Sequence, residues 1–365
     1  MTVTYTELYG SFAAAATGAW TDEDLFTDFS IPKGAVAEIL IENPTDASTP
    51  TVGVRVNGSA LSRWVVLHEA EGLGDVPFGT HVSMYVQTDA NGVIEYWSSS
   101  ATVTFRVMGY FQGCTYREKI ATFQTAINSE WVPVDLKIYG VPRERVCDIW
   151  LNHDDEANNP DIGVRTRGSA LVRKEIVHEA EGGGNSGLTY IVRSDASGYV
   201  EVYTNDTADS FFTLFGYFSY EVDFVERWQQ ITLVTAAAWT DTDLTAYLDV
   251  DGRIVHFVLS HNLTSYSRKL GIRTNGSALA RLPSENEAES NAYAGFGVSV
   301  KSDANGIVEY YINTAVAAGL WMLDGYFKDG ISRAATLFTN VRGRGGDAQR
   351  KMGFARSLRA QFEGS

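Results

Sequence analysis

Apolar and polar residues alternate along most of this chain with a period of two, which predicts β-strands. Residues 35–42 form one such run, and residues 102–107 form another. Residues 82–88 and 93–97 are two further runs, joined by Asp-Ala-Asn-Gly. Because Asn-Gly readily adopts positive φ angles, this pair predicts a β-hairpin. The spacing of runs and turns predicts about seven or eight short strands in the first ~110 residues, which is typical of a β-sandwich.

The same arrangement then occurs twice more. A Gly-x-Arg-x-x-Gly-Ser-Ala-Leu-x-Arg motif begins at Gly53, Gly163 and Gly271, so its steps are 110 and 108 residues. Four further landmarks keep the same order: a tryptophan (Trp20, Trp131, Trp239), Glu-Ala-Glu (69–71, 179–181, 287–289), an Asp-Ala-x-Gly turn (89–92, 195–198, 303–306) and Gly-Tyr-Phe (109–111, 216–218, 325–327). A period of this length is the size of a complete small domain.

The expected fold is therefore all-β: three tandem homologous antiparallel β-sandwich domains of jelly-roll type, followed by a short basic arm. We place the domains at residues 1–114, 115–222 and 223–334, and the arm, with helical periodicity, at 335–365. Only about twenty residues separate each Gly-Tyr-Phe from the landmark tryptophan of the next unit. We therefore expect the sandwiches to be closely strung or packed on one another.

The charge balance excludes several classes of function. The chain has 45 acidic and 29 basic residues, a net charge of −16, which argues against a general nucleic-acid surface. It has no run near the ~20 apolar residues of a membrane span. The first residues lack the basic and apolar segments of a secretory signal, and two cysteines do not make a disulfide framework.

Repeated arginines and glutamates are the main candidates for chemistry. Two carboxylates two residues apart on a strand share a face, which is compatible with glycosidic acid/base catalysis. Against this, arginine is a rigid partner that ties neighbouring strands to carboxylates, and one chain seldom carries three equal active sites. We therefore expect structural or interface roles, with no catalytic residue, metal or cofactor, for Arg55, Arg63, Glu69, Glu71, Arg165, Arg173, Glu179, Glu181, Arg273, Arg281, Glu287 and Glu289.

Other candidates each leave two interpretations open. His68 and His178 precede Glu-Ala-Glu, but Asn286 replaces them in the third unit, so we expect core or surface histidines and not metal ligands. The acidic run 154–161 is a solvated loop or a Ca²⁺ loop. The Gly-rich segments 72–79, 182–187 and 290–297 are tolerated surface loops or contact loops. The tyrosines of Gly-Tyr-Phe (Tyr110, Tyr217 and Tyr326) pack in the core or stack on carbohydrate.

The end of the chain reverses the charge. Residues 341–365 carry six basic and two acidic side chains, or +4, which leaves −20 for the rest. Apolar residues recur there every four positions, as on one face of a helix. A mobile basic segment with an apolar stripe suits a docking arm, and a frayed terminus is the alternative. The residues expected to make the assembly contact are Arg342, Arg344, Arg350, Lys351, Phe354, Arg356, Leu358, Arg359 and Phe362.

Taken in order, Gly-Val-Arg-x-x-Gly-Ser, a distal Arg, Asp-x-x-Gly-x-x-Glu-x-Tyr and a last strand ending in Gly-Tyr-Phe resemble a β-sandwich module of tailed-bacteriophage virion proteins. Those proteins decorate heads or build tail and neck appendages. The resemblance covers all three units but not the arm, and the third unit departs from it at Pro283 and Asn286.

The resemblance implies a non-enzymatic structural component of a virus particle: a phage capsid decoration, collar or tail protein. Such a protein is assembled in the host cytoplasm, becomes part of the virion, and has other virion proteins or copies of itself as partners. Neither a membrane nor nucleic acid is expected as a partner. The alternative is an appendage protein that binds a receptor or glycan through the Gly-rich loops.

Overall fold

The computed structural model describes residues 2–15, 17–45, 48–70, 79–156, 158–180, 183–262, 268–285, 292–313 and 319–329. Residues Met1–Asp329 form one compact unit, and Gly330–Ser365 form a second unit that lies outside the described residues. The predicted arm and all of its assembly residues therefore lie outside the described part, as do Glu71, Glu181, Glu287 and Glu289 and much of the three Gly-rich segments.

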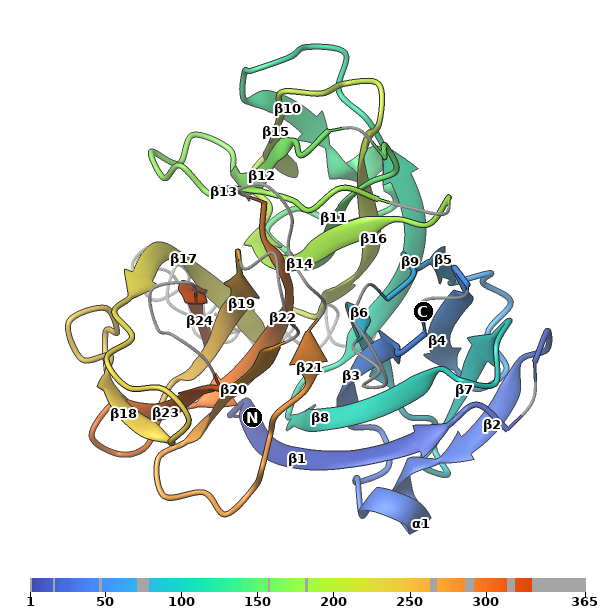
Figure 1. Cartoon of the computed structure of the whole chain (residues 1–365), viewed down its shortest axis with the longest axis vertical. Coiled ribbons are helices and arrows are strands. Elements are labelled where there is room, and N and C mark those ends of the chain that lie inside the picture. Colours follow the sequence, from blue (N-terminus) through green and yellow to red (C-terminus); the bar gives the residue numbers. More distant parts are fainter. Residues whose placement is uncertain are drawn as a thin grey trace, which may run out of the picture. The chain divides into compact units, whose positions relative to one another are not determined.

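The first sandwich consists of eight strands in two four-stranded sheets (Figure 1). The order is β1-β8-β3-β6 in one sheet and β2-β7-β4-β5 in the other, with all pairs antiparallel. This is the strand order of a jelly roll. The strands are β1 (Thr4–Ala13), β2 (Thr21–Asp24), β3 (Val36–Asn43), β4 (Thr51–Val56), β5 (Val65–Val66), β6 (Thr80–Gln87), β7 (Val93–Ser98) and β8 (Thr104–Gln112).

Two more sandwiches repeat this order, so the predicted class of antiparallel jelly-roll-like sandwiches is confirmed. Sandwich 2 contains β9 (Tyr116–Phe123), β10 (Val132–Asp135), β11 (Val146–His153), β12 (Asp161–Thr166), β13 (Lys174–Ile176), β14 (Ser186–Arg193), β15 (Tyr199–Thr204) and β16 (Ser210–Phe218). Sandwich 3 contains β17 (Val222–Ile231), β18 (Thr240–Asp243), β19 (Ile254–His261), β20 (Arg268–Thr274), β21 (Ser284–Glu285), β22 (Ala294–Lys301), β23 (Ile307–Ile312) and β24 (Gly319–Asp329).

The predicted hairpin at residues 82–97 is wrong. The turn itself is present: Asp89 N donates to Val93 O at 3.0 Å, and Gly92 has φ +95°. However, β6 pairs with β3 in one sheet, and β7 pairs with β2 and β4 in the other. The turn residues specify a reversal of the chain but not the pairing of the strands beside it. The connection therefore crosses between the two sheets.

One sheet of each sandwich, which we call the inner sheet, faces the other two sandwiches. It contains β3, β11 or β19, and these three strands are buried at all eight positions. The inner sheets meet through their edge strands β6, β14 and β22, which contact one another near the centre of Figure 1. In the outer sheets, buried and half-buried side chains alternate along β7, β15 and β23. The strands of the inner sheets lack this alternation, because neighbouring sandwiches cover their second face.

A β-bulge in each inner sheet places one side chain in the neighbouring sandwich. The strand pairing omits Met108, Phe215 and Asp324 in turn, immediately before the glycine of each Gly-Tyr-Phe. Met108 packs in the core cluster of sandwich 3, Phe215 packs in that of sandwich 1, and Asp324 contacts Arg173 of sandwich 2. A bulge re-aims a side chain in this way. The cores of the three sandwiches are therefore shared.

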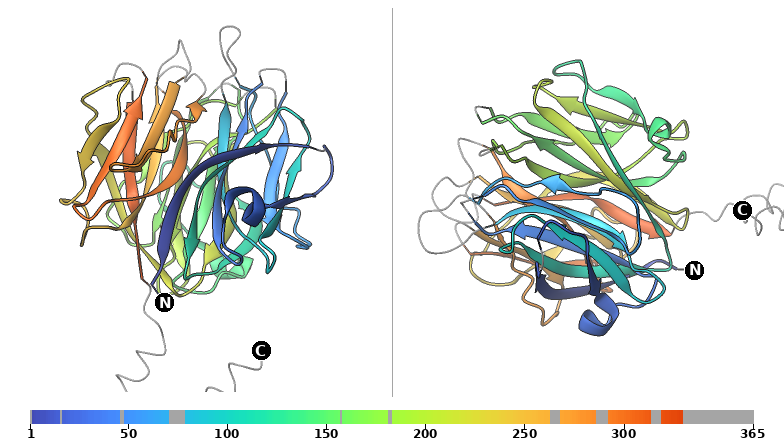
Figure 2. Two further views of the ribbon diagram at one scale, coloured as in Figure 1. Left: turned by 90° about the horizontal axis from the view of Figure 1, so that it is seen from below. Right: turned by 90° about the vertical axis from the view of Figure 1, so that its right-hand side faces the viewer.

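Short helical turns follow β2 and β10. Helix α1 (Leu25–Phe29) is capped by Asp24, whose carboxylate accepts from Thr27 N, and it lies at the outer side of sandwich 1 (Figure 2). The 3-10 turn η1 (Leu136–Tyr139) has the same kind of cap at Asp135. Among the described residues, no helix has the length and apolar character that crossing a membrane requires.

Candidate functional site

The most elaborate arrangement of polar side chains lies where the sandwiches meet. We call the three interfaces seam 1–2, seam 2–3 and seam 3–1, after the sandwiches that each one joins. Backbone hydrogen bonds cross every seam beside β5, β13 and β21. The bonds are His68 N to Asn185 O (3.1 Å) and Asn185 N to Val66 O (3.2 Å) at seam 1–2, Tyr293 N to Ile176 O (2.9 Å) and His178 N to Tyr293 O (3.3 Å) at seam 2–3, and Gly79 N to Ser284 O (3.3 Å) at seam 3–1.

A fully buried arginine bridges each seam to a glutamate of the next sandwich. The nitrogen–oxygen distances are 3.6 Å for Arg63–Glu118, 2.6 Å for Arg173–Glu226 and 3.0 Å for Arg281–Glu7. Sandwich 1 thus reaches sandwich 2, sandwich 2 reaches sandwich 3, and sandwich 3 reaches sandwich 1. We call these three pairs the seam clasps. They form a closed ring.

Each clasp also satisfies backbone groups. The arginines donate to carbonyl oxygens of the inner edge strands. The glutamates accept from the amide of the last residue of β4, β12 or β20, in the sandwich that supplies the arginine. The carbonyl acceptors are Tyr85 O (2.8 Å), Ile191 O (2.9 Å) and Ser299 O (3.0 Å), and the amide donors are Val56 N (2.7 Å), Thr166 N (2.7 Å) and Thr274 N (2.8 Å). Buried charges persist when they are paired and hydrogen-bonded in this way.

A second buried carboxylate supports each seam. Glu38, Asp148 and Asp324 accept from the amides of Ser299 (2.7 Å), Tyr85 (3.4 Å) and Ile191 (3.1 Å), respectively. In sandwiches 1 and 2 this acid also accepts from a tyrosine hydroxyl, Tyr5 (2.5 Å) or Tyr116 (3.1 Å). Burial raises the pKa of Asp148 to about 7, with Arg63 opposing the rise.

Sandwich 3 uses a rearranged version of this second support. His256 stands at the strand position that Glu38 and Asp148 occupy, and the acid has moved to the bulge residue Asp324. Asp324 contacts Arg173 directly, and His256 Nδ1 lies 2.9 Å from its carboxylate. Burial alone would raise the pKa of Asp324, but Arg173 and the hydrogen bond from His256 lower it below its ordinary value.

The phenylalanines of the three Gly-Tyr-Phe motifs meet one another. Ring centroids lie 5.4 Å apart for Phe111–Phe218, 5.1 Å for Phe111–Phe327 and 5.8 Å for Phe218–Phe327. These rings are the centre of an apolar cluster with members from all three sandwiches. The preceding glycine is required by the close passage of β1, β9 or β17: a Cβ on Gly109 would lie 2.3 Å from the Tyr5 hydroxyl.

The tyrosines of the same motifs were predicted to pack in the core or to stack on carbohydrate. Tyr326 is buried. Tyr110 and Tyr217 are half-buried and pack against the core clusters of sandwiches 1 and 2, respectively, in contact with apolar side chains.

The other repeated arginine of each unit lies in the outer sheet. Arg55, Arg165 and Arg273 stack over Trp20, Trp131 and Trp239, with the guanidinium carbon 4.0, 4.1 and 4.0 Å from the ring centroid. Each also pairs at 2.8 Å with a glutamate on the adjacent strand: Glu95, Glu201 or Glu309. These contacts explain why a tryptophan, an arginine and the glutamate that follows the Asp-Ala-x-Gly turn recur together in each unit.

The ion pairs described above give the repeated arginines carboxylate partners that lie outside the Glu-Ala-Glu motif. At the described positions Glu69 and Glu179, the backbone carbonyls contact the Nδ1 atoms of His68 and His178. Both histidines are buried, and their rings meet edge to face at 5.9 Å. Burial, with a smaller effect of His178, lowers the pKa of His68 to about 4.

The acidic run 154–161 contributes one member to a cluster of carboxylates. Oxygens of Asp155, Asp206 and Asp209 lie within 4.8 Å of one another. Burial, together with Asp206 and Asp155, raises the pKa of Asp209. Such clusters of partly exposed acids are common without an ion, so this one by itself defines no cation site.

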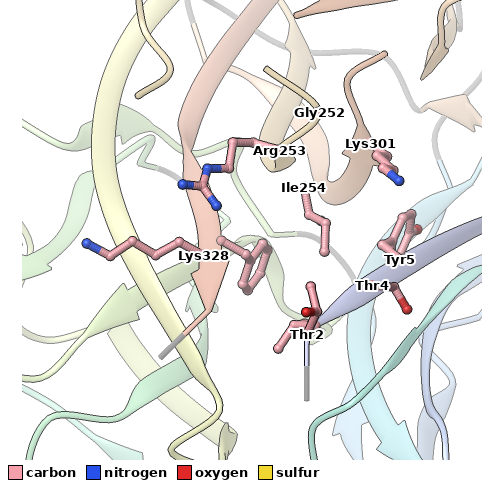
Figure 3. A pocket seen from close by; sticks show the side chains of 10 residues that line it. Thr2, Thr4, Tyr5, Gly252, Arg253, Ile254, Lys301 and Lys328 are labelled. Carbon is pink, nitrogen blue, oxygen red and sulfur yellow. The ribbon is translucent and has the colours of Figure 1, made fainter. Parts of the chain in front are cut away.

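Seam 3–1 has a hollow of about 170 Å³ between the start of β1 and the ends of β22 and β24 (Figure 3). Three cations line it: Arg253, Lys301 and Lys328. Arg253 is already paired with Asp249 at 2.8 Å, and Lys328 is paired with Asp223 at 3.5 Å. Two of the three lining cations are therefore neutralised, and we interpret the hollow as a gap in the packing of the seam.

Comparison with known proteins adds little to this geometry. No family model matches the chain, and no curated protein matches it. The N-terminal CBM22-1–CBM22-2 tandem of Xyn10C from Paenibacillus barcinonensis superposes with a TM-score of 0.16 and 10% identity, covering 60% of this chain and 94% of that one. A structure described as the triple jelly roll fold and turret assembly in an archaeal virus superposes with a TM-score of 0.19 and 8% identity, covering 90% of this chain and 91% of that one. Scores this low support no functional argument.

Sequence reasoning missed the carboxylate half of the clasps. Glu7, Glu118 and Glu226 follow an aromatic residue by two positions, at Tyr5, Tyr116 and Phe224, with steps of 111 and 108 residues. This short repeat was available as a signal. It is weaker than the five landmarks because only two positions recur.

Proposed function

We propose that this chain is a non-enzymatic structural component of a virus particle, of the phage decoration, collar or tail type, and that it acts as a single rigid building block. The observation that carries the proposal is the closed ring of seam clasps, Arg63–Glu118, Arg173–Glu226 and Arg281–Glu7. Three copies of one sandwich, joined by equivalent contacts, reproduce within one chain what a cyclic trimer builds from three. The sequence resemblance to tailed-bacteriophage modules supports the same class.

The placement of the repeated charged residues also supports a structural role. The clasp arginines are fully buried, and their guanidinium groups are committed to carboxylates and carbonyl oxygens. The outer arginines stack on tryptophan and pair with glutamate. Side chains held in this way stabilise seams and sheets and are not presented to a substrate.

The basic arm is proposed as the contact with the particle. Opposite charge steers encounter over about a Debye length, ~8–10 Å near physiological salt. Exposed ion pairs contribute only ~0–1 kcal/mol each, so the apolar stripe of Phe354, Leu358 and Phe362 must supply the remainder at ~1.5–3 kcal/mol per buried side chain.

Deleting residues 341–365 is expected to leave a folded, acidic protein that no longer joins its particle. The measurement is co-sedimentation with particles assembled without the protein, together with a particle reconstruction that locates the full chain. As a matched control, substituting only the six basic residues should weaken joining. The salt dependence of joining should then differ from that of the full chain. If the truncated chain joins as well as the full one, the arm is a frayed end and the contact lies elsewhere.

An alternative function, binding of a receptor glycan, is favoured by one feature of sandwich 1. Three half-buried tryptophans lie on or directly before strands of its outer sheet, with centroid distances of 4.7–5.9 Å: Trp20, Trp64 and Trp97. Sandwiches 2 and 3 have Lys174 and Leu282 in place of Trp64. Aromatic faces of this kind stack on sugar rings, although one face of Trp20 is taken by Arg55.

If that surface binds sugars, a glycan array should give hits that Trp64→Leu reduces at least tenfold. This variant copies the third sandwich, so the fold is expected to be retained. Array signals that are absent, or unchanged by Trp64→Leu, would leave the structural role as the single proposal.

A further inference from the structure

Glu175 is a buried acid without a cation of its own. It lies on β13, and its residue is 5% exposed. The next residue, Ile176, accepts the hydrogen bond from Tyr293 N that crosses seam 2–3. Neither carboxyl oxygen of Glu175 has a hydrogen-bond partner among the described residues. An ionised carboxylate in that position would be strongly disfavoured.

The ionisable groups around Glu175 do not neutralise a charge there. Tyr190 of β14 and Tyr293 beside β22 are uncharged, and Asp324 of β24 is an anion. Arg173, two residues away, is committed to Glu226, Asp324 and Ile191 O.

His256, which also faces this region, is hydrogen-bonded to Asp324. Seam 2–3 therefore already holds two carboxylates around one guanidinium, and a third negative charge would have no counter-ion.

We propose that Glu175 makes seam 2–3 a proton-dependent closure: the seam holds while the Glu175 carboxyl carries its proton, and it loosens when the carboxyl ionises. Burial, with a smaller contribution from Asp324, raises the pKa of Glu175 to about 8. Its side chain is therefore neutral at pH 7 and becomes charged under mildly alkaline conditions. The inference concerns the chain alone and does not depend on the proposed virion role.

The other two seams provide the comparison. At the position of Glu175, sandwich 1 has Val65 and sandwich 3 has Pro283, neither of which can ionise. Val65 is 8% exposed, so the fold accepts an apolar side chain there. Asp148 at seam 1–2 also has a raised pKa, about 7, but its carboxylate accepts from Tyr116 and Tyr85 N and faces Arg63. Seam 2–3 is therefore the seam whose acid has no support when ionised.

The sign of the pH dependence follows from linkage. Because the pKa of Glu175 is higher in the folded chain than the ~4.3 of an unfolded chain, the folded state retains a proton that the unfolded state loses. The contribution of Glu175 to stability is therefore fully present below pH ~4 and is lost as the pH rises to about 8. The folding equilibrium constant should fall by up to tenfold per pH unit from this one group.

The experiment compares the full chain with Glu175→Val, which copies sandwich 1, and with Glu175→Gln, which is isosteric with the neutral acid. Denaturant unfolding from pH 6 to pH 8 should show the wild-type equilibrium constant falling by up to ~100-fold more than that of either variant. Hydrogen-exchange protection of Tyr293 N–H and His178 N–H, which bridge the seam, should decrease above pH 8 in the wild type alone. Glu144→Gln, an exposed carboxyl in the same sandwich, should retain the wild-type slope.

A direct titration covers the case in which a variant fails to fold. In wild-type protein with ¹³C-labelled glutamate, one carboxyl should titrate near pH 8, above Glu23, whose pKa burial and Asp28 raise to about 7. If no glutamate titrates above Glu23, or if both variants keep the wild-type slope and the wild-type exchange behaviour, the proposal is overturned.

Discussion

Replacing Arg173 by alanine is expected to destabilise the folded chain by about 3–5 kcal/mol, because it leaves Glu226 and Asp324 buried without their cation. The residue itself is fully buried, so solvent does not compensate for the loss. Denaturant unfolding at pH 7 measures the effect as a lower midpoint at constant slope.

The matched control for this prediction is Arg165→Ala in the outer sheet of the same sandwich. That arginine is 14% exposed; it makes one ion pair, stacks over Trp131 and donates a hydrogen bond to Leu171 O. Its loss should cost about 1–2 kcal/mol, the sum of a partly exposed ion pair, a cation–π contact and one hydrogen bond to a carbonyl oxygen. Equal effects of the two variants would mean that the seam clasps do not hold the sandwiches together.

Replacing Phe218 by alanine should cost about 3–5 kcal/mol, because the ring is fully buried and the cavity would open at the point where all three sandwiches meet. Because Phe111 and Phe327 lose a partner in two other sandwiches, the loss should lower the stability of the whole described unit. The expected unfolding remains a single transition, seen at one midpoint by far-UV circular dichroism and by tryptophan fluorescence.

Phe26→Ala serves as the control, since that ring is 46% exposed on α1 and its loss should change stability by less than ~0.5 kcal/mol. Two separate transitions in the Phe218 variant, with two sandwiches unfolding at the wild-type midpoint, would contradict a shared core. The bulge residues Met108 and Phe215, each packed in a neighbour's core, are the reason to expect one transition.

The sequence by itself determined the triplication, the β class and the recurrent local contacts. These depend on residues close in the chain or on equivalent strands: the period of two predicts strands, and the Asp-Ala-x-Gly turns reverse the chain because glycine tolerates positive φ. The hairpin was wrong because turn chemistry does not decide whether the strands on either side pair or separate into two sheets. Arg55 was predicted to serve structure, but its partner Glu95 was not predicted.

Only the tertiary structure shows how the recurring residues of the three units contact one another. Arg63 and Glu118 lie in different repeats, and Arg281 and Glu7 lie 274 residues apart, so no spacing rule connects them. A periodic pattern shows that units are alike, but the energy of burying an inner sheet against two neighbours depends on how the units are placed. The movement of the acid from the strand position of Glu38 to the bulge position of Asp324 makes the same point. Both positions bring a carboxylate within hydrogen-bonding distance of a backbone amide of the neighbouring sandwich. The requirement is therefore a place in the folded structure and not a position in the sequence.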